Sequence, residues 1–526
     1  MDEAGNGALD LMNDIPRGVE DAGGAVRLDE QLLPMAVFTR PETAGADPAL
    51  RFDGWRIFLG LAGGRTERRP RSDGTSEAHV LGGRAIGIAS DMHMLTVAGS
   101  RAGKGRSVIV PTLLSYEGSV LAIDPKGELA SLTARARAER LGQKVHVLDP
   151  FGVTSGYAAT RRASFNPMRL LRYGSRRTGR GSATIVEDGG LIADALVMRE
   201  PGARDPHWDD SARNLIEGVT LHVATWRKYW RRRHLGTVRD LIMGRAEHRG
   251  RTGMEVLQAE MQENAALGGR DAAEDFFSKP DDERESVLST ARRHIRFLSY
   301  ESIKGVLSGH DFDLADLKRG RVTIYLCLPA MRMGTCNRWL RLFVNLALAA
   351  FETTAGRPEP PVLMCLDEFA VLGHLKTIED AAGQIAGFGV RLWPIVQDLG
   401  QLKALYRDRW QTFMGNAGVL QFFGNNDTFT LDWVSKRLGT TSLIVENRAE
   451  VGEREATKED RRGLSWSAQT RSLMTGEEIA RFFSRDDPLQ RQLIIWTGGH
   501  PLILQRAKYD SHELFAGLAD DPESRH

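Results

Sequence analysis

The sequence predicts an α/β protein whose mostly parallel sheet is interrupted by an all-α domain. From about residue 94 onward, short apolar runs alternate with helical patterns. Strands of about four to seven residues that alternate with helices of about ten are typical of βαβ units, whose parallel sheets are covered on both faces. Between about residues 184 and 300 the alternation stops, and apolar residues such as Leu215, Val219 and Val223 recur at helical spacing instead.

The expected strands are the apolar runs of this alternating pattern. They are Leu95–Val97, Val120–Ile123, Val145–Leu148, Val322–Leu328, Val362–Leu366, Val390–Val396 and Val419–Phe423. Helices are expected between them where apolar residues repeat at helical spacing, at Gly103–Leu114, Leu129–Leu141, Asn337–Phe351 and Thr377–Ile385.

These patterns divide the chain into a leader, a discontinuous domain and an insertion. Residues 1–79 are rich in Gly, Pro, Asp and Arg, and we expect a partly ordered leader there, with short strands from Arg51 to Leu61. Residues 80–184 and 306–526 are expected to form the sheet-containing domain, and residues 185–305 the all-α domain. The charged segment Glu450–Gly463 is expected to be an exposed loop, and Asp520–His526 a frayed tail.

The composition is that of a globular protein with balanced charge. Lys and Arg total 70 and Asp and Glu total 69, so the formal net charge is +1, and a nucleic-acid partner must be sought in local clusters. Three cysteines exclude a disulfide framework and favour a reducing compartment, the cytoplasm. The most apolar stretches, Trp55–Gly64 and Leu340–Phe351, are short or interrupted, whereas a bilayer crossing needs about 20 apolar residues. We therefore expect no transmembrane segment.

A phosphate-binding loop is expected where the first of these strands leads into a helix. Consecutive backbone N–H groups of a loop of small residues converge on an anion, and the helix N-terminus adds its positive dipole. The P-loop consensus G-x-x-x-x-G-K-[ST] is met except at Ala98, in place of Gly, and at Gly105, in place of the hydroxyl that binds Mg²⁺. A plain Gly-rich turn is the alternative. The expected nucleotide-binding residues are Gly99, Ser100, Arg101, Ala102, Gly103, Lys104, Gly105 and Arg106, with Lys104 on the β- and γ-phosphates.

A second pattern is typical of nucleotide hydrolysis. The run Val362–Leu366 ends in Asp367 and Glu368. In P-loop ATPases, the Asp at such a strand end holds Mg²⁺ through water, and the Glu orients or deprotonates the attacking water. Helix capping is the alternative role for such acids. Gln397 ends another strand, where its amide is expected to sense the γ-phosphate. The expected catalytic residues are thus Glu368, Lys104 and Gln397, and the expected cofactors are ATP and Mg²⁺.

Several motifs match one known family. They are Ala98-Gly-Ser-Arg-Ala-Gly-Lys-Gly105, Val110-Pro-Thr-Leu-Leu114, Leu121-Ala-Ile-Asp-Pro-Lys-Gly-Glu128, Val147-Leu-Asp-Pro150, Phe165-Asn-Pro167, Asp367-Glu368-Phe369, Val396-Gln-Asp-Leu-Gly-Gln-Leu402, Phe423-Gly-Asn-Asn-Asp427 and Ser435-Lys-Arg-Leu-Gly439. Over about residues 80–504 the chain resembles the TraG-like type IV secretion coupling proteins, the hexameric ATPases of bacterial conjugation.

This resemblance implies a RecA-like nucleotide-binding domain interrupted by an all-α domain, with six subunits around a central channel and ATP bound between neighbours. It implies phosphate binding for Lys104, Mg²⁺ binding for Asp367, water activation for Glu368 and sensing for Gln397. It also places Asp124, Lys126 and Glu128 along the nucleotide site. Typical members begin with transmembrane helices, which are not expected here, so a separate membrane anchor protein is expected.

Two basic clusters are candidates for contact with nucleic acid. The segment from Arg161 to Arg180 contains seven arginines and no acid, and Trp226-Arg-Lys-Tyr-Trp-Arg-Arg-Arg-His234 interleaves cations with aromatic residues. Cations neutralise phosphates and aromatic faces stack on bases, a combination suited to single strands. A solvated basic run, with Trp226 and Trp230 packed in the helical domain, is the alternative. The candidate contacts are Arg227, Lys228, Trp230, Arg231 and Arg232.

The predicted function is that of an ATP-hydrolysing coupling protein that recruits relaxase-bound single-stranded DNA and drives it into a type IV secretion channel. It is expected to act as a homo-hexamer in the cytoplasm, held at the inner membrane by a partner protein. Two alternatives stay open. One is a non-motor receptor in which ATP is structural, and the other is an ATPase that exports effector proteins.

Overall fold

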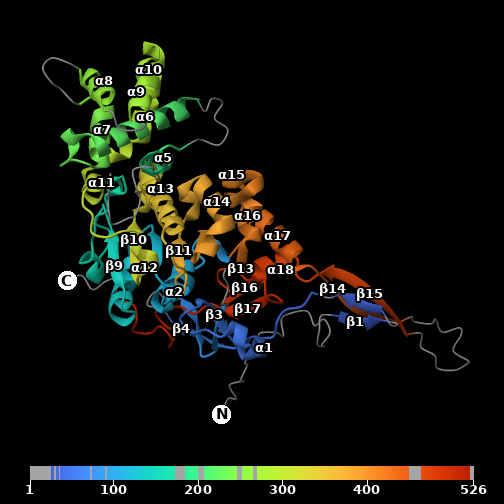
Figure 1. Ribbon diagram of the computed structural model, residues 1–526. Coiled ribbons are helices and arrows are strands. Elements are labelled where there is room, and N and C mark those ends of the chain that lie inside the picture. Colours follow the sequence, from blue (N-terminus) through green and yellow to red (C-terminus); the bar gives the residue numbers. More distant parts are fainter. Residues whose placement is uncertain are drawn as a thin grey trace, which may run out of the picture.

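The fold is organised around one sheet of 11 strands, seen in the computed structural model of the chain (Figure 1). The structure describes residues 25–28, 31–34, 36–70, 74–88, 92–171, 184–198, 207–245, 252–264, 269–448 and 464–521.

One side of the sheet is parallel and contains the strands that the sequence predicts. In spatial order these are β9 (Lys144–Leu148), β10 (Val322–Cys327), β8 (Val120–Asp124), β11 (Val362–Leu366), β12 (Val390–Val396), β7 (His93–Ala98) and β13 (Ala417–Phe423). Each neighbouring pair is parallel. The prediction of these strands and of the α/β fold class is confirmed.

The other side of the sheet is antiparallel. It continues from β13 through β16 (Arg491–Trp496), β17 (Leu502–Gln505), β3 (Ile57–Ala62) and β6 (Arg84–Ile88), with antiparallel pairing at each step. The alternation of strands and helices does not predict this side, because antiparallel neighbours need no helix between them. β3 falls within the range 1–79 expected to be a leader, so the sheet begins earlier in the chain than residue 80.

Both faces of the sheet are buried, as is usual for parallel strands. Alternate residues of β7 belong to different apolar cores, Leu95 and Val97 to one and Met94 and Ala98 to the other. The second of these cores includes α2 (Val110–Ser115) and α3 (Glu128–Arg135). The first includes α13 (Ala330–Thr353), α14 (Lys376–Gln384), α15 (Leu399–Tyr406), α16 (Trp410–Gly415), α17 (Thr428–Leu438) and α18 (Gly476–Phe482).

A group of helices occupies one end of the molecule, next to α13 (Figure 1). It comprises α5 (Ile185–Leu196), α6 (His207–Thr225), α7 (Leu235–Ile242), α8 (Gly253–Glu263), α9 (Gly269–Phe277), α10 (Asp281–His294) and α11 (Glu301–Val306). Every regular element that the structure describes between residues 184 and 306 is helical. Leu215 and Val219 of α6 belong to the same apolar core as Phe343 of α13, so these helices are packed onto the sheet domain.

Hairpins and short helices complete the described part of the chain. The hairpins pair β1 (Ala25–Leu28) with β2 (Gln31–Pro34), β4 (Arg65–Pro70) with β5 (Ser76–Leu81), and β14 (Thr440–Arg448) with β15 (Leu464–Ser472). The β14–β15 ribbon extends away from the body (Figure 1). The short helices are α1 (Pro41–Ala46), α4 (Gly156–Ala159) and α12 (Asp316–Arg319).

The remaining expectations concern a charged loop, the C-terminal tail and membrane-spanning helices. The predicted loop Glu450–Gly463 and most of the predicted tail Asp520–His526 lie outside the described residues. Within the described ranges, none of the helices combines the length and the hydropathy that a bilayer crossing requires.

Candidate nucleotide site

The predicted phosphate loop, acids and glutamine follow three neighbouring strands, and Gly424 follows a fourth strand beside them. β11, β12, β7 and β13 lie side by side and run parallel, so their carboxyl ends meet at one edge of the sheet. The phosphate loop follows β7, Asp367 and Glu368 follow β11, Gln397 follows β12, and Gly424 follows β13. Ligands of open α/β sheets bind outside this edge.

The phosphate loop turns tightly against the end of β13. A Cβ atom at Gly99 would lie 1.8 Å from the carbonyl oxygen of Gly424, so this close approach requires glycine. The backbone N–H of Gly99 donates to Phe423 O at 3.2 Å. Further along the loop, Arg101 and Gly103 have φ values of 58° and 87°. A left-handed arginine is strained, and such strain is retained where the surrounding structure dictates the turn.

The helix after the loop begins with a π-helical turn, Gly105–Ile109, before α2. The N–H of Val110 donates to the carbonyl of Gly105, five residues earlier. Pro111 accounts for the wider turn, because proline lacks an N–H and its ring would clash with the carbonyl four residues back in a regular α-helix. Single π turns are frequent at functional sites. The first N–H groups of this helix lack helical partners and face an incoming anion.

Lys104 lies between the two predicted acids. Its Nζ atom is 3.0 Å from Asp367 Oδ1 and 2.8 Å from Glu368 Oε1. Burial disfavours the charged ammonium, but both carboxylates outweigh this effect, so the pKa of Lys104 lies above its usual value. Burial raises the pKa of Asp367, and Lys104 opposes that shift. The structure thus brings together Lys104, Asp367 and Glu368, the residues that the sequence predicts to bind phosphate, to bind Mg²⁺ and to activate water.

Glu368 and Gln397 are joined by a hydrogen bond. Gln397 Nε2 donates to Glu368 Oε2 at 3.3 Å. The carbonyl of Gln397 accepts from Asn425 Nδ2 at 3.1 Å, and its N–H donates to Gln401 Oε1 at 3.1 Å. Glu368 itself has a φ of 53°, a left-handed conformation that glutamate rarely adopts. The glutamate is therefore held from both sides, by Lys104 on one oxygen and by Gln397 on the other.

Asp124, at the end of β8, has a structural role at this edge. Its carboxylate accepts from the N–H groups of Ala130 at 2.8 Å and of Lys126 at 3.3 Å, which fixes the turn into α3. Burial raises its pKa to about 6. Lys126 and Glu128 are exposed, so of the three only Asp124 is fixed inside the fold.

The residues at this edge fit a magnesium ion held through water by one carboxylate. Asp367 is buried, and its carboxylate already faces a cation, the ammonium of Lys104. At Gly105 no atom lies within 4 Å of an added Cβ, so the position of the missing hydroxyl is open space. Hard divalent cations prefer carboxylate and water oxygens, and Mg²⁺ usually keeps several of its waters.

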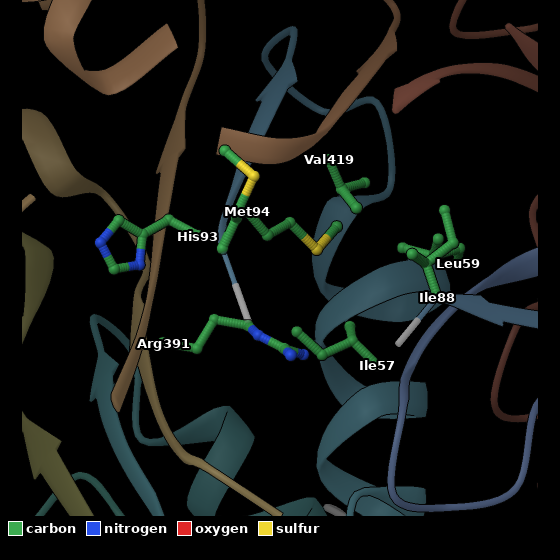
Figure 2. Close-up of a pocket in the computed structure, with 8 residues that line it drawn as sticks. Ile57, Leu59, Ile88, His93, Met94, Arg391 and Val419 are labelled. Carbon is green, nitrogen blue, oxygen red and sulfur yellow. The ribbon is translucent and has the colours of Figure 1, made fainter. Parts of the chain in front are cut away.

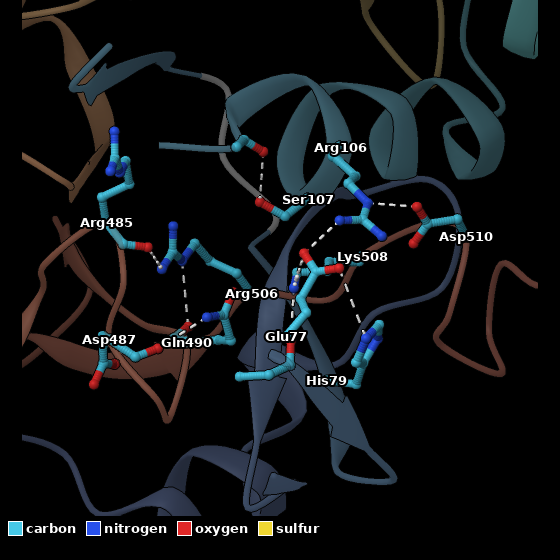
Figure 3. Close-up of polar contacts among 12 residues, drawn as sticks. Glu77, His79, Arg106, Ser107, Arg485, Asp487, Gln490, Arg506, Lys508 and Asp510 are labelled. Carbon is cyan, nitrogen blue, oxygen red and sulfur yellow. Dashed lines mark hydrogen bonds and ion pairs between the residues drawn. The ribbon is translucent and has the colours of Figure 1, made fainter. Parts of the chain in front are cut away.

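Arg106 does not face the phosphate loop. Its guanidinium pairs with Asp510 and, at 2.5 Å, with Glu77 of β5 (Figure 3). Its side chain is therefore used to attach the helix to the β4–β5 hairpin and to the segment after β17. Because its side chain is used in these pairs, Arg106 is left with only its backbone N–H to bind nucleotide as predicted.

Two buried arginines at the site carry no sequence signal. Arg506 donates from Nη1 to the carbonyl of Ala102 at 2.7 Å, inside the phosphate loop. Arg341 of α13 donates to the carbonyls of Leu372 and His374, in the loop that follows Glu368. In the sequence, Arg506 follows an apolar run and Arg341 interrupts one. Neither arginine belongs to a motif that would identify it.

A small apolar pocket lies at the opposite edge of the sheet (Figure 2). It is next to His93 and Met94, at the amino end of β7, and is also lined by Ile57, Leu59, Ile88, Met92, Arg391 and Val419. Because the phosphate loop follows the carboxyl end of β7, this pocket is separate from the nucleotide site. Apart from His93 and Arg391, its lining residues are apolar.

The second basic cluster forms the connection between α6 and α7. Arg227, Lys228, Trp230, Arg231 and Arg232 are all exposed, and Trp230 is 70% exposed. Trp226 packs beside His222, with ring centroids 5.7 Å apart. Of the two tryptophans, only Trp226 is therefore packed in the helical domain. Among the described residues, Lys228 has a carboxylate partner, Glu260, whereas no ion pair is made by Arg231 or Arg232.

The first basic cluster lies only partly within the described residues. Arg161 stacks on the Tyr157 ring at 4.9 Å, and Arg162 lies 3.4 Å from Asp149. Arg169 is the third described arginine, and Arg172, Arg176, Arg177 and Arg180 lie outside the described ranges. Arg161 and Arg162 therefore have local partners.

Comparisons with known proteins identify the relatives of this chain. A family model described as type IV secretory system conjugative DNA transfer matches residues 65–523. The chain is 27% identical over 457 residues to the conjugal transfer protein TraG of Escherichia coli. This match covers 82% of this chain and 69% of that protein. The chain is 29% identical over 427 residues to the protein VirD4 of Rhizobium radiobacter, over 80% of this chain and 57% of that one.

Solved structures of the conjugative coupling protein TrwB share the fold. An unbound form has a TM-score of 0.58 at 16% identity and covers 80% of this chain and 86% of that one. A complex of TrwB with ADP and Mg²⁺ has a TM-score of 0.57 at 16% identity, over 80% of this chain and 88% of that one. The resemblance to TraG-like coupling proteins and the RecA-like fold class are both confirmed. Since the family model covers most of its residues, the chain belongs to the type IV secretory system conjugative DNA transfer family.

Proposed function

We propose that the protein is an ATP-hydrolysing coupling protein that drives single-stranded DNA, with its bound relaxase, into a type IV secretion channel. The observation that carries the proposal is the convergence of Lys104, Asp367, Glu368 and Gln397 at one edge of the sheet. A lysine for phosphate, an acid for the metal and a positioned base are the parts that phosphoryl transfer to water requires. The existence of TrwB complexes with ADPNP and with ADP and Mg²⁺ supports nucleotide binding by a protein of this fold.

In this proposal, the contacts of Lys104 with the two acids are exchanged for contacts with the nucleotide when ATP binds. Lys104 leaves the carboxylates and binds the β- and γ-phosphates, and loop N–H groups between Ser100 and Arg106 bind the remaining phosphate oxygens. Asp367 would hold Mg²⁺ through water, and the ion would supply positive charge that neutralises the phosphates. Glu368, freed from Lys104, accepts a proton from the attacking water, while the amide of Gln397 keeps its carboxylate in place.

We also propose that six copies form a ring with ATP between neighbours, as the family resemblance implies. Because a secretory system crosses a membrane, the ring would work at the inner membrane, attached to a partner protein. Lys104 and Glu368 remain partly accessible, with side chains 18% and 30% exposed, so a neighbouring subunit has access to the site. An arginine from that neighbour would complete the charge stabilisation.

The cluster between α6 and α7 is the proposed DNA contact. Arg231 and Arg232 are exposed without carboxylate partners among the described residues, and Trp230 presents an open ring for stacking. A strand that neutralises these arginines would bind with an affinity that falls as salt rises, by about 0.7 logarithmic units per contact and per tenfold salt.

The decisive experiment compares ATP hydrolysis with and without single-stranded DNA. We expect Mg²⁺-dependent phosphate release that single-stranded DNA stimulates. Lys104→Ala, the control for the site, should lose both release and nucleotide affinity measured by calorimetry. Binding of ATP without hydrolysis under every condition would instead favour the non-motor receptor.

A second arm tests the DNA contact itself. The double substitution Arg231→Ala with Arg232→Ala should weaken binding of a fluorescent single strand and reduce the salt slope by about 1.4. The matched control is Arg270→Ala, an exposed arginine of α9 in the same helical region. Equal loss in both variants would remove the cluster from the proposal. Stimulation of hydrolysis by an effector protein but not by DNA would favour the effector-exporting ATPase.

A further inference from the structure

The segment after β17 holds the phosphate loop from both sides of Lys104. Before the lysine, Arg506 Nη1 donates to Ala102 O at 2.7 Å. After it, the N–H of Tyr509 donates to Arg106 O at 3.0 Å, and Asp510 pairs with the guanidinium of Arg106. Figure 3 shows Arg506 and Asp510 on either side of the start of the helix. A segment about 400 residues away in sequence thus fixes the loop.

Arg506 is a buried cation without a carboxylate at bonding distance in the described part of the chain. Its residue is 2% exposed, and its other hydrogen bonds go to the carbonyls of Gln490, Ser484 and Arg485, at 3.4, 3.5 and 3.4 Å. Its guanidinium also lies 4.9 Å from the ring centre of Phe423. Burial lowers its pKa to about 10, so it stays charged at neutral pH. Burying a cation without a carboxylate partner is costly. The burial of Arg506 therefore indicates a function beyond stability.

The bond to Ala102 O fixes the direction of one N–H in the phosphate loop. The carbonyl of Ala102 and the N–H of Gly103 belong to one planar trans peptide, so they point in opposite directions. With the carbonyl turned back toward Arg506, the N–H of Gly103 faces away from Arg506, on the side where the phosphates would lie. Gly103 has a φ of 87°, and glycine rotates freely. Without a fixed partner, this peptide could therefore turn over and present its carbonyl to the phosphates.

We propose that Arg506 is a positioning residue of the nucleotide site: it holds the Ala102–Gly103 peptide in the orientation that presents an N–H to the phosphates of ATP or ADP. The inference rests on the nucleotide-binding function proposed above. Arg506 acts on the nucleotide through Ala102, and its charge behind the loop adds an attraction for the anion. The same guanidinium binds the loop between α18 and β16, which also holds Gly424 through the bond from Gly424 N to Phe483 O at 2.7 Å.

The test uses a matched pair of buried arginines in the full-length protein. Arg137 is 0% exposed, its pKa is also lowered to about 10 by burial, and it also donates to backbone carbonyls, those of Leu113, Tyr116 and Gly118. These carbonyls lie just before β8, at the edge of the sheet opposite the phosphate loop. Substitution of either arginine by Gln or Lys should lower the unfolding temperature.

Only the Arg506 variants should lose nucleotide affinity. At a temperature where both proteins are folded, we expect Arg506→Gln to raise the Kd for a fluorescent ADP analogue about tenfold or more, because a hydrogen bond to a charged group is lost. Arg506→Lys, which keeps the charge and one donor, should recover part of the affinity. Arg137→Gln and Arg137→Lys should bind with the Kd of the parent. Hydrolysis should show a raised KM with a smaller change in kcat.

Two outcomes would overturn the inference, and they are distinguishable. If Arg506→Gln is folded and binds the analogue with the Kd of the parent, Arg506 is structural only, and the proposed nucleotide site stands. If the parent itself fails to bind, the proposed function falls and the inference with it. Should Arg506→Gln not fold, Arg506→Lys and Gly103→Ala test the same peptide. Unchanged affinity in both would refute the inference, and weakened affinity in both would support it.

Discussion

Lys104 and Glu368 form an ion pair in which Nζ and Oε1 are 2.8 Å apart. The pair joins the residue expected to bind phosphate to the residue expected to activate water. The carboxylates and the phosphates compete for Lys104, because its ammonium has only three donors. In the proposed function, ATP binding breaks this pair and so releases Glu368 for its role as a base.

Glu368→Gln should separate binding from hydrolysis. The amide cannot accept a proton, so phosphate release at steady state should fall about 100-fold or more. ATP affinity should stay the same or increase, because Lys104 loses a competing charge. Release can be followed with a phosphate-binding dye and affinity by calorimetry. Turnover equal to that of the parent would exclude Glu368 as the base.

Gln397→Ala should lower hydrolysis without abolishing it. The substitution removes the 3.3 Å hydrogen bond to Glu368 Oε2 and leaves the base in place but less well positioned. Loss of a hydrogen bond to a charged group predicts a decrease in kcat of about tenfold. Gln384→Ala, an exposed glutamine of α14, is the control and should hydrolyse ATP at the parental rate. A parental kcat in Gln397→Ala would remove Gln397 from the reaction.

Much of the site follows from sequence because its residues stand at the ends of continuous apolar runs. β7, β11 and β12 are predicted as strands, and parallel strands bring their carboxyl ends to one edge. This geometry is sufficient to expect Lys104, Asp367 and Gln397 near one another. It does not predict the ion pair of Lys104 with both acids, because side-chain distances depend on the unliganded conformation of the loop.

The antiparallel part of the fold and the supports of the phosphate loop do not follow from local patterns. β16 and β17 pair with β13 and β3, which are distant in sequence, and such pairing leaves no periodic signal. The bond from Arg506 to Ala102 depends on that pairing, because Arg506 follows β17 directly. A lone arginine after an apolar run is no different in sequence from a surface residue. The exposed ring of Trp230 and the packed ring of Trp226 are likewise indistinguishable by spacing.

The glycines of the phosphate loop should differ in their tolerance of side chains. Gly99→Ala places a Cβ 1.8 Å from Gly424 O, and overpacking of this kind typically destabilises by about 1–3 kcal/mol. Gly105→Ser meets no atom within 4 Å and should leave stability unchanged or raise it by about 0.5 kcal/mol. Both free energies of unfolding can be measured with urea.

Gly105→Ser also tests the magnesium site. Its hydroxyl stands where the P-loop consensus places a ligand for Mg²⁺, so half-maximal hydrolysis should require a lower Mg²⁺ concentration. Gly105→Ala is the control, since it adds the Cβ without the oxygen. An identical Mg²⁺ requirement in the serine and alanine variants would show that the ion does not reach this position.

His93, beside the apolar pocket, should make the protein less stable in acid (Figure 2). Burial lowers its pKa from 6.5 to about 4, and Nδ1 accepts the N–H of Leu392 at 3.2 Å, a bond that requires the neutral ring. Because the folded state lowers this pKa, the contribution of His93 to the free energy of unfolding is complete above about pH 6.5. As pH falls toward 4, this free energy decreases by about 3 kcal/mol. His93→Asn keeps an acceptor without titrating, so its free energy of unfolding should fall less over this range. The exposed His500→Asn should follow the parent curve. Parallel urea-unfolding curves for His93→Asn and the parent from pH 7 to pH 4 would contradict the assignment.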